Sequence, residues 1–463
     1  QTRRGDIKRV NGKGESMTFE NKGKENNGAT YGRRSDWQNL YTIAKKYYEA
    51  LLADPGNAQF HLTDPRGASD KSGRTFNNPY QYFFEQMHMD DAIYADESIY
   101  EYPMQQGGGN DGRPYSFGRP SSGGSKAAYP CKSYGQGRIN PAYFYGIFDP
   151  NDMRRDVSIT MTGSNGKGVE KLIPFVPNSK AEGGGLTLNK WDENRQANPW
   201  VAAQRKSGIN GPYMRMSEVY LGYAEVCAAL GDVVTGKQYL KTVRERSFPQ
   251  GLADTDGFIA SFGNDLVRAI IEERGFEYAG EGDRRWTLIR SGYLPEDIKR
   301  IKDMTKAMMD GLATKGYYEF ENGNIISAYI WTKLVDAKTI YGHRLTAQCP
   351  MDKVNDPVLY PGWRGQKDNW EEMGLNYGNS APATNLAIKG LFEIVSEEEA
   401  ASLESQGYAK VNWGIDLVDY RDEYDKYLFW DYDYVSAPIY LWPFTPNVMA
   451  AGGFTNGYGF KQE

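Results

Sequence analysis

The sequence feature that most constrains the fold is a helical pattern that continues from residue 212 to residue 292. Apolar residues recur three and four positions apart over 216–230, and a second helix over 234–246 would run back antiparallel to the first. Capping residues and glycines bound two further helices, over 265–279 and 283–291. Successive helical hairpins are typical of helical-repeat scaffolds. We therefore expect a mainly α fold: a tetratricopeptide-like scaffold of helical hairpins with long irregular loops and minor β structure.

Another helix is expected far upstream of these hairpins, over 36–53, where an Asp-Pro-Gly sequence ends it. It resembles the second helix of a tetratricopeptide repeat, which needs a first helix to pack against. The residues immediately before it are too polar to supply that helix. We therefore expect that sequence is absent before Gln1.

The rest of the chain contains many glycines and prolines, which interrupt regular structure. We expect a single body over 1–463, in which 36–54 and 212–292 form the scaffold and 61–210 and 300–463 form loop-rich portions facing ligand and partner. Loops on a rigid scaffold are where binding usually occurs. Within the last portion, apolar spacing predicts helices over 385–394 and 396–406.

Charge and cysteine content argue against several classes of protein. The formal charge is −6 and the pI is near 5.5, whereas a nucleic-acid-binding protein usually carries a basic face. No stretch approaches the roughly 18 apolar residues that a membrane helix needs. The three cysteines make no disulfide framework, and Cys227 falls on the apolar face of a predicted helix. A neutral ligand fits this composition better than a nucleic acid.

No catalytic signature stands out, and we expect neither an enzyme nor a cofactor. The sequence has no G-x-S-x-G, H-E-x-x-H or phosphate-binding loop. Its histidines, His61, His88 and His343, lack the spacing of metal ligands, so no metal site is expected. A helical glycoside hydrolase that uses two carboxylates remains a less favoured alternative, because acidic residues are abundant.

Two groups of charged residues are interpreted as ion pairs. One group lies on adjacent turns of the predicted hairpins, where a salt-bridged network is favoured over an active site. Its members are Glu273, Arg274, Glu277, Arg284 and Arg290. The other group, Asp149, Asp152 and Asp156, lacks a calcium-binding pattern, so a solvated loop or an ion pair with Arg154 or Arg155 is favoured over a calcium site.

Aromatic residues make up 14% of the chain. Rings placed among Gly, Pro, Asn and Asp are typical of loops and surfaces, and an amphipathic ring suits a surface that is half apolar and half wet, as a sugar is. Six of them are our ligand-binding candidates: Trp191, Trp200, Tyr82, Phe83, Tyr94 and Tyr115. A wider set of loop aromatics adds Tyr80, Phe84, Tyr100 and Tyr102. The alternative is that these rings pack loops onto the scaffold. Trp286, on a predicted helix, is expected in the core.

Several segments, in this order and spacing, resemble the SusD/RagB family of surface lipoproteins. The helix pair is similar to the family's P-Y-x-R-x-x-E-x-x-L-x-Y-A-E and V-R-x-R sequences, and the following pair is similar to E-R-x-x-E-x-x-x-E-G-x-R-x-x-D-L-x-R-x-G. The matching segments are 212–225 with 242–246, 271–292, the closing segment 438–449, and 149–156, which resembles D-P-R-R-D. Thr287 stands where the family usually has Asp, which puts one expected charge contact in doubt.

The resemblance implies a function and a place. Members of this family capture a nutrient, here an oligosaccharide, and deliver it to a SusC-type TonB-dependent transporter. They do so on the extracellular face of the outer membrane, held by a lipid anchor that this sequence does not contain. A peptide is the alternative ligand within the same family. The family's N-terminal helical block is not found, so the chain is expected to be a fragment.

Overall fold

The computed structural model describes residues 9–10, 16–17, 36–56, 62, 64, 79–86, 97–108, 112–120, 133–164, 170–177, 184–192, 205–206, 208–336, 384–428 and 444–453. Two short strands, β1 (Arg9–Val10) and β2 (Ser16–Met17), pair antiparallel near the N-terminus. Within the described residues, no helix combines the length and the apolarity needed to cross a membrane.

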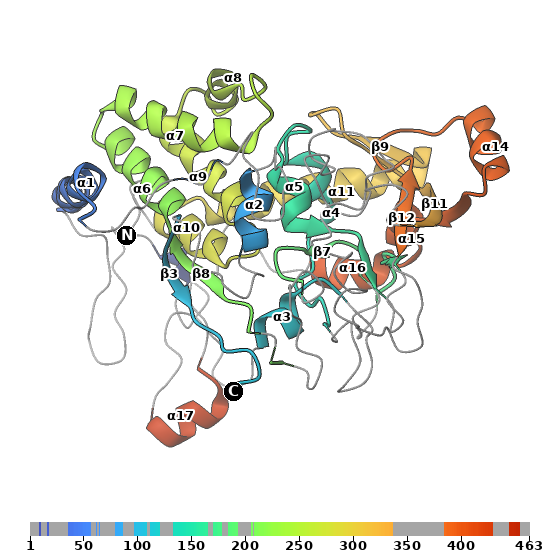
Figure 1. Ribbon diagram of the computed structural model, residues 1–463, viewed down its shortest axis with the longest axis horizontal. Helices are drawn as coiled ribbons and strands as arrows, with labels where there is room; N and C mark the ends of the chain where they lie inside the picture. The colour runs from blue at the N-terminus through green and yellow to red at the C-terminus, as the bar shows by residue number, and fades with distance from the viewer. Residues whose placement is uncertain are drawn as a thin grey trace.

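Helical hairpins form one half of the molecule, at the left of Figure 1. The helices α6 (Met216–Ala229) and α7 (Val233–Ser247) pack against each other, and α9 (Leu266–Glu277) packs on both, followed by α10 (Asp283–Ser291). Their apolar faces meet in a core that includes Leu221, Leu240, Val243 and Ile270. The mainly α scaffold predicted from the sequence is confirmed.

Side-chain caps start two of these helices. Asp232 accepts a hydrogen bond from the backbone N–H of Thr235, and Asp265 accepts one from that of Arg268. Asn264, directly before the cap of α9, adopts a left-handed backbone conformation with φ of 63°.

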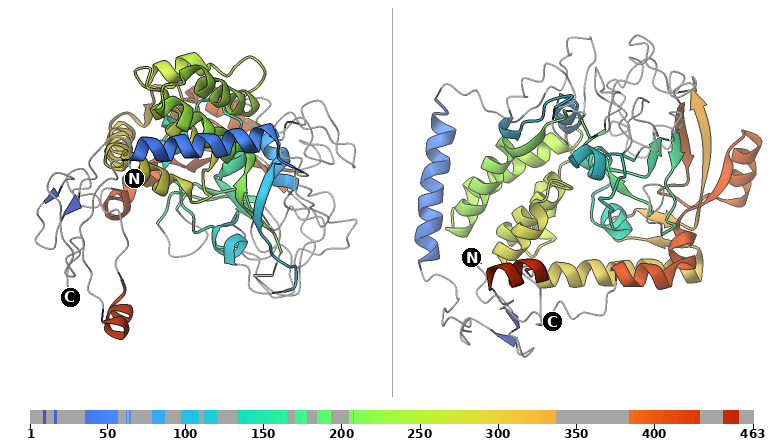
Figure 2. Two further views of the ribbon diagram at one scale, coloured as in Figure 1. Left: turned by 90° about the vertical axis from the view of Figure 1, so that its left-hand side faces the viewer. Right: turned by 90° about the horizontal axis from the view of Figure 1, so that it is seen from below.

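The upstream helix α1 (Trp37–Ala53) packs across α6. Its residues Tyr41, Ala44, Tyr48 and Leu52 contact the cluster of Tyr223, Val226 and Cys227 on α6. This helix was predicted over 36–53. Figure 2 shows α1 at the edge of the helical half, with α6 beside it.

The approach of α1 to α6 depends on a glycine. A Cβ atom on Gly222 would lie 2.3 Å from the Tyr48 hydroxyl oxygen, closer than a Cβ contact allows. Gly222→Val is therefore expected to push α1 away and to lower the free energy of unfolding by about 1–3 kcal/mol. Hydrogen exchange over 37–53 should rise. Gly112→Ala is the control, because a Cβ there meets no atom within 4 Å. Equal exchange over α1 in both variants would contradict this role for Gly222.

The long helix α11 (Leu294–Lys315) links the two halves of the molecule. It contacts α10 at its start, then α4 (Pro141–Gly146), β9 (Tyr317–Glu319) and α15 (Gly414–Asp419). Gly316, in the left-handed region with φ of 76°, ends it. Between α7 and α9 lies the short helix α8 (Thr255–Ala260), which has no counterpart among the predicted helices.

The second half is built on small antiparallel sheets. β9 pairs with β10 (Ile325–Ser327), and β11 (Tyr329–Asp336) is the centre of a three-stranded sheet between β12 (Thr384–Lys389) and β13 (Ala409–Asn412). Helices α14 (Glu397–Ser405) and α16 (Arg421–Leu428) lie around this sheet, and α17 (Pro446–Gly452) lies near the C-terminus.

The predicted helix over 385–394 is wrong, since the chain there forms strand β12. Leu386, Ala387 and Ile388 are all buried beside β11. A short apolar run that is covered on both sides has the same pattern whether it is a strand or a helix. The neighbouring predicted helix over 396–406 is confirmed as α14, which Ser396 caps.

The segment 61–210 contributes to the core and is not simply loop. Its described parts form α2 (Pro79–Gln86), β3 (Ser98–Tyr102), α3 (Gly112–Phe117), α4, α5 (Arg154–Ser158) and the strands β4 (Ile159–Thr160), β5 (Thr162–Ser164), β6 (Glu170–Leu172) and β7 (Thr187–Leu188). Phe144, Tyr145 and Phe148 are fully buried with Met308 of α11 in an extensive apolar cluster. Elements this short leave no clear period in the sequence.

Trp286 lies on the surface, with 56% of its side chain exposed, and its predicted place in the core is wrong. The buried residues of α10 are Thr287, Leu288 and Ser291. The Thr287 hydroxyl bonds both Arg274 and Asp283, so a polar contact sets which face of this short helix turns inward.

Candidate functional site

A two-stranded ribbon brings several exposed aromatic rings together. β3 pairs antiparallel with β8 (Gly211–Arg215), with Tyr100 opposite Met214 and Tyr102 opposite Gly211. Register shifts interrupt the pairing on both sides of Tyr100. Such irregularities re-aim side chains along a strand.

The side chains on this ribbon are large and open to solvent. Tyr100 is 57% exposed, Tyr102 55%, Tyr213 74% and Met214 41%. The Tyr100 and Tyr213 rings meet edge to face, with centroids 5.6 Å apart and planes at 89°. We call Tyr100, Tyr102, Tyr213 and Met214 the aromatic ribbon. Its flat apolar faces and phenol hydroxyl groups suit a ligand with both apolar and polar surface.

A stacked arginine supports one end of the aromatic ribbon. The guanidinium carbon of Arg113, from α3, lies 5.8 Å from the centroid of Tyr102 and 5.6 Å from that of Trp191. Arg113 crosses β8 at Gly211, where a Cβ would lie 1.2 Å from its nitrogen Nη1. A cation above an aromatic ring is attracted to its face, so this contact holds Tyr102 in place from the inner side.

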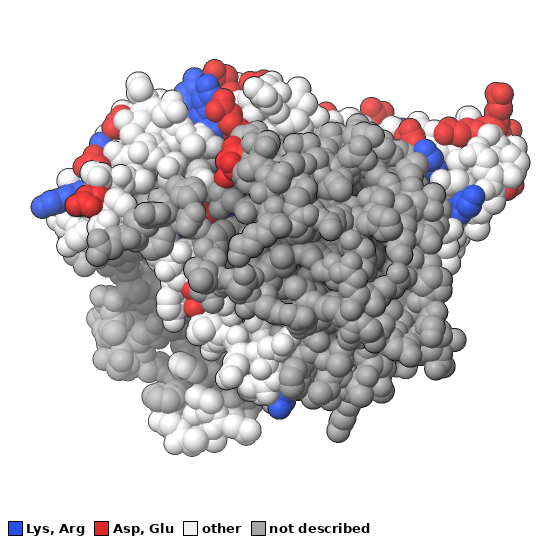
Figure 3. Space-filling model, in the orientation of Figure 1, with Lys and Arg blue, Asp and Glu red and all other residues white. Residues whose placement is uncertain are grey.

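The described surface beside one end of the aromatic ribbon is mostly uncharged. In Figure 3 the described surface over α3 and the adjacent end of β3 is mostly uncharged, whereas charged groups gather over α7 and α14. Between the two tyrosines of β3, burial raises the pKa of the Glu101 carboxyl, and Ser98 and Asn210 offset this only in part. The mostly uncharged surface over α3 suits a neutral ligand with hydroxyl groups.

The structure describes the side chains of three of the six predicted ligand-binding residues. Trp191 is 3% exposed and packs with Leu188 and Ile209. Tyr115, with Arg205 stacked 4.1 Å from its centroid, and Phe83 are also buried. The expectation of open rings at these three positions is wrong, because each fills space between the irregular segments and the scaffold.

The side chains of the other three predicted ligand-binding residues are not described. Trp200 and Tyr94 lie outside the described residues, and only the backbone of Tyr82 is described, in α2. The wider predicted set did contain Tyr100 and Tyr102. Sequence reasoning missed Tyr213 and Met214 because they directly precede α6 and read as its start. The proline at 212 favours an extended conformation only at the residue before it, so no local signal separates these two residues from the start of a helix.

The predicted salt-bridged network is confirmed, and it is buried. Arg154 donates to Asp152 at 2.6 Å, to Glu273 at 2.7 Å and to Glu277 at 3.0 Å. Arg215 and Arg246 both donate to Glu97 and to Glu277. The network joins α5, α7, α9 and β8. At its margin, Lys190 forms an ion pair with Glu281.

The charge contact that the threonine at position 287 put in doubt is made by Asp283 instead. Arg274 donates to Asp283 and to Glu218, each at 2.7 Å, and its Nε donates to the Thr287 hydroxyl at 3.2 Å. Arg290 pairs with Glu225, and Arg284 with Glu272 and Asp297. These charges lock the hairpins together, as the sequence predicted.

Two of the three acidic residues in the segment 149–156 pair with arginine, while Asp149 accepts a hydrogen bond from the backbone N–H of Asn151. Asp152 pairs with Arg154, and Asp156 with Arg155 at 2.9 Å. No group of three metal-binding side chains occurs among the residues that the structure describes. Ion pairing is therefore the role that the structure gives to Asp152 and Asp156.

The buried carboxylates make stability depend on pH. Burial alone would raise the pKa of Glu272, but Arg284, Arg300 and Arg268 outweigh burial and lower it from 4.5 to about 2. Because the folded-state pKa is depressed, the stabilisation is present above pH 4.5 and is lost as pH falls towards 2. We expect Glu272 to contribute about 3 kcal/mol of this loss. Urea unfolding across this range should show it. Glu272→Gln should flatten the dependence, and an unchanged pH slope in that variant would contradict the assignment.

Comparisons of this chain with known proteins found one matching family model and several similar solved structures. A sequence model of the SusD family matches residues 58–443. No curated protein matches the chain. A SusD homologue from Bacteroides thetaiotaomicron is 17% identical, with a TM-score of 0.39 over 59% of this chain and 56% of that one.

Two further solved structures are similar to this chain. Surface glycan-binding protein A from Bacteroides thetaiotaomicron, in complex with laminarihexaose, is 20% identical with a TM-score of 0.39, over 56% of this chain and 52% of that one. NanU from Bacteroides fragilis is 18% identical with a TM-score of 0.35, over 56% and 52%. The chain thus spans little more than half the length of these structures.

Proposed function

Because the chain belongs to the SusD family, we propose that it captures a neutral oligosaccharide on the aromatic ribbon and catalyses no reaction. The observation that carries this proposal is the group of exposed rings on β3 and β8, of which Tyr213 is 74% exposed. Exposed aromatic groups of this size are binding features when they cluster. The glycan bound in the related glycan-binding protein A supports the same ligand class.

The physical fit is between ring faces and sugar faces. A pyranose ring has a face of C–H groups that packs on an aromatic ring, and its rim of hydroxyl groups can bond to phenol oxygens. The open position of Tyr100, Tyr102 and Tyr213 allows several sugar units to lie along the strands. The sparse local charge fits a neutral oligosaccharide better than an acidic one.

The ion pairs of Glu273 and Glu277 argue against a catalytic role for these two buried carboxylates. A glycoside hydrolase needs one carboxyl group free to donate a proton and another free to attack or to activate water. Glu273 and Glu277 instead each accept hydrogen bonds from two or three guanidinium groups. Arginines around Glu277 hold the pKa of its carboxyl well below the usual range, against the effect of burial. Such a group cannot act as a general acid near neutral pH.

The proposal extends to the place and the partner of the protein. It acts at the extracellular face of the outer membrane, lipid-anchored, and passes its ligand to a SusC-type TonB-dependent transporter. A binder seated on a transporter keeps the ligand at high effective concentration over the channel. Family membership supports this arrangement.

The test is a panel of neutral oligosaccharides and peptides measured by isothermal titration calorimetry, with chromatography of the products. Saturable binding of a glycan without cleavage is the expected result. Binding of peptides alone, or enzyme-dependent cleavage, would overturn the proposal. For the partner, mild-detergent purification of the intact lipoprotein from native membranes should recover a barrel transporter. Recovery of the lipoprotein alone after gentle cross-linking would rule out a stable complex.

A further inference from the structure

The two chains that form the aromatic ribbon stay side by side beyond its last strand pair. The side-chain oxygen of Asn210 accepts a hydrogen bond from the backbone N–H of Met104 at 2.7 Å. Further along, the backbone N–H of Gly107 donates to the carbonyl of Lys206 at 2.9 Å. Figure 1 shows α3 near this end of β3 and β8. The surface that β3 and β8 begin therefore continues past the tyrosines towards α3.

A stacked guanidinium group lies at the end of this extension. The guanidinium carbon of Arg205 is 4.1 Å from the ring centroid of Tyr115, which belongs to α3. The Tyr115 ring is buried, and Tyr134 packs on it edge to face, with centroids 5.0 Å apart. Arg205 itself is exposed. A cation is attracted to the face of an aromatic ring, so the tyrosine pair holds this guanidinium in place at the surface.

The backbone and the charge state of Arg205 both set it apart. Its φ is 64°, in the left-handed region. A non-glycine residue is uncommon there, and such strain collects at sites that hold a ligand. No carboxylate among the described residues forms an ion pair with Arg205. Its N–H donors therefore remain available to a ligand.

A fixed guanidinium suits the hydroxyl groups of a sugar. It presents several N–H donors in one plane, and neighbouring hydroxyl oxygens can accept two of them together. Resting on the glycan capture proposed above, we propose that Arg205 forms an end subsite for an oligosaccharide that extends past the aromatic ribbon. From Tyr213 back to Arg205 the chain can span at most about 28 Å. Only a long ligand reaches both, so the end subsite makes capture depend on chain length.

The test is a length series, from disaccharide to octasaccharide, of the glycan identified by the panel, measured by calorimetry. Wild-type affinity should rise with length beyond the shortest oligosaccharide that binds. In Arg205→Ala the affinity for the longest should fall about tenfold. The shortest should bind as in wild type, because it covers the rings alone. Alanine keeps a Cβ atom and hence the same backbone strain, so the melting temperature should barely change.

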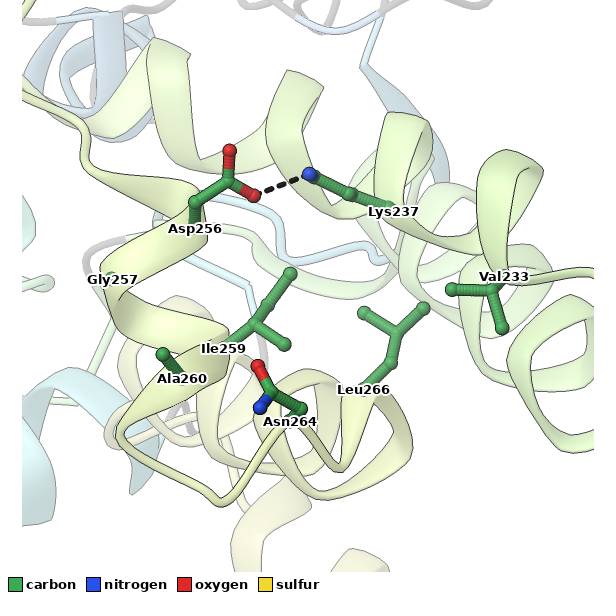
Figure 4. Close-up of a pocket in the computed structure, with 8 residues that line it drawn as sticks. All are labelled: Val233, Lys237, Asp256, Gly257, Ile259, Ala260, Asn264 and Leu266. Atoms are coloured by element: carbon green, nitrogen blue, oxygen red, sulfur yellow. Dashed lines mark ion pairs between the residues drawn. The ribbon is translucent and has the colours of Figure 1, made fainter.

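Two further variants separate hydrogen bonding from charge. Arg205→Lys keeps the positive charge but loses the planar set of donors, so it should bind long oligosaccharides almost as weakly as Arg205→Ala. Lys237→Ala is the control. Lys237 is 43% exposed and pairs with Asp256 at a surface pocket on α7 and α8, elements separate from the aromatic ribbon (Figure 4). Its loss should leave the length series unchanged.

Several results would overturn this proposal. Wild-type affinity of Arg205→Ala for the longest oligosaccharide would remove Arg205 from the site. An equal loss for short and long oligosaccharides would mean that Arg205 supports the rings and forms no end subsite. Should Arg205→Ala fail to fold, wild-type binding by Arg205→Lys would contradict the role of the paired donors. If no glycan bound at all, the proposed function itself would fail, whereas a wild-type length series in Arg205→Ala contradicts the end subsite alone.

Discussion

Replacing Glu277 with glutamine is expected to lower the free energy of unfolding by about 3–5 kcal/mol. Glu277 is fully buried and is shared by Arg154, Arg215 and Arg246. Glutamine has almost the same shape, so the loss would come from charge and not from a cavity. Breaking a buried pair leaves uncompensated charge in a poorly solvated place. Here three guanidinium groups would be affected together.

Urea unfolding, followed by tryptophan fluorescence and circular dichroism, measures this effect. Asp303→Asn is the matched control, because Asp303 forms an ion pair with Lys299 on the exposed side of α11. Exposed pairs contribute little, so the control should unfold at nearly the wild-type midpoint. If both variants unfolded at the same midpoint, the buried network would not be the source of stability that we infer.

The second large effect is on binding. The variant Tyr213→Ala is expected to lose about thirtyfold in affinity for the glycan identified by the panel, which corresponds to about 2 kcal/mol for an aromatic hot spot. Its melting temperature should barely change, since 74% of the side chain is already exposed. Tyr213→Phe keeps the ring and should retain most of the affinity if stacking dominates.

Calorimetry on these variants needs a tyrosine outside the aromatic ribbon as its control. Tyr47 on α1 is 73% exposed and serves this purpose, so Tyr47→Ala should bind normally. Tyr100→Ala should resemble Tyr213→Ala, because the two rings contact each other. If Tyr213→Ala and Tyr47→Ala bound the glycan equally well, the aromatic ribbon would not be the binding face.

The helical half could be predicted from the sequence because each of its helices carries its own signal. The periods over α6, α7 and α9 are local, and so are the stops at glycines 231 and 292. β12 was misread because a short buried apolar run has no period that separates strand from helix. The burial of Phe144 and Tyr145 was missed for a related reason, since α4 is too short to show a pattern.

The candidate site was harder to predict, because strand pairing across a long stretch of chain creates it. Tyr100 was identified as a surface aromatic, but its neighbour Tyr213 lies more than 100 residues away in sequence and was assigned to a helix. Trp191 was chosen for its polar neighbours in sequence. In the fold its neighbours are Leu188 and Ile209, together with the stacked Arg113. Exposure of a single ring depends on such distant contacts.

The sequence separations within the buried network bear on how the chain folds. Glu97 pairs with Arg215 across 118 residues and with Arg246 across 149, and Arg154 reaches Glu273 across 119. Contacts this distant form late and slow the folding rate, because loop-closure entropy is lost before they can stabilise the chain. Unfolding must separate the same charges before water can reach them. We expect the folded state to be long-lived, and its resistance to proteases to be set by the height of this barrier more than by equilibrium stability. At the extracellular location that we propose, where chaperones cannot refold the protein, that persistence would matter more than rapid folding.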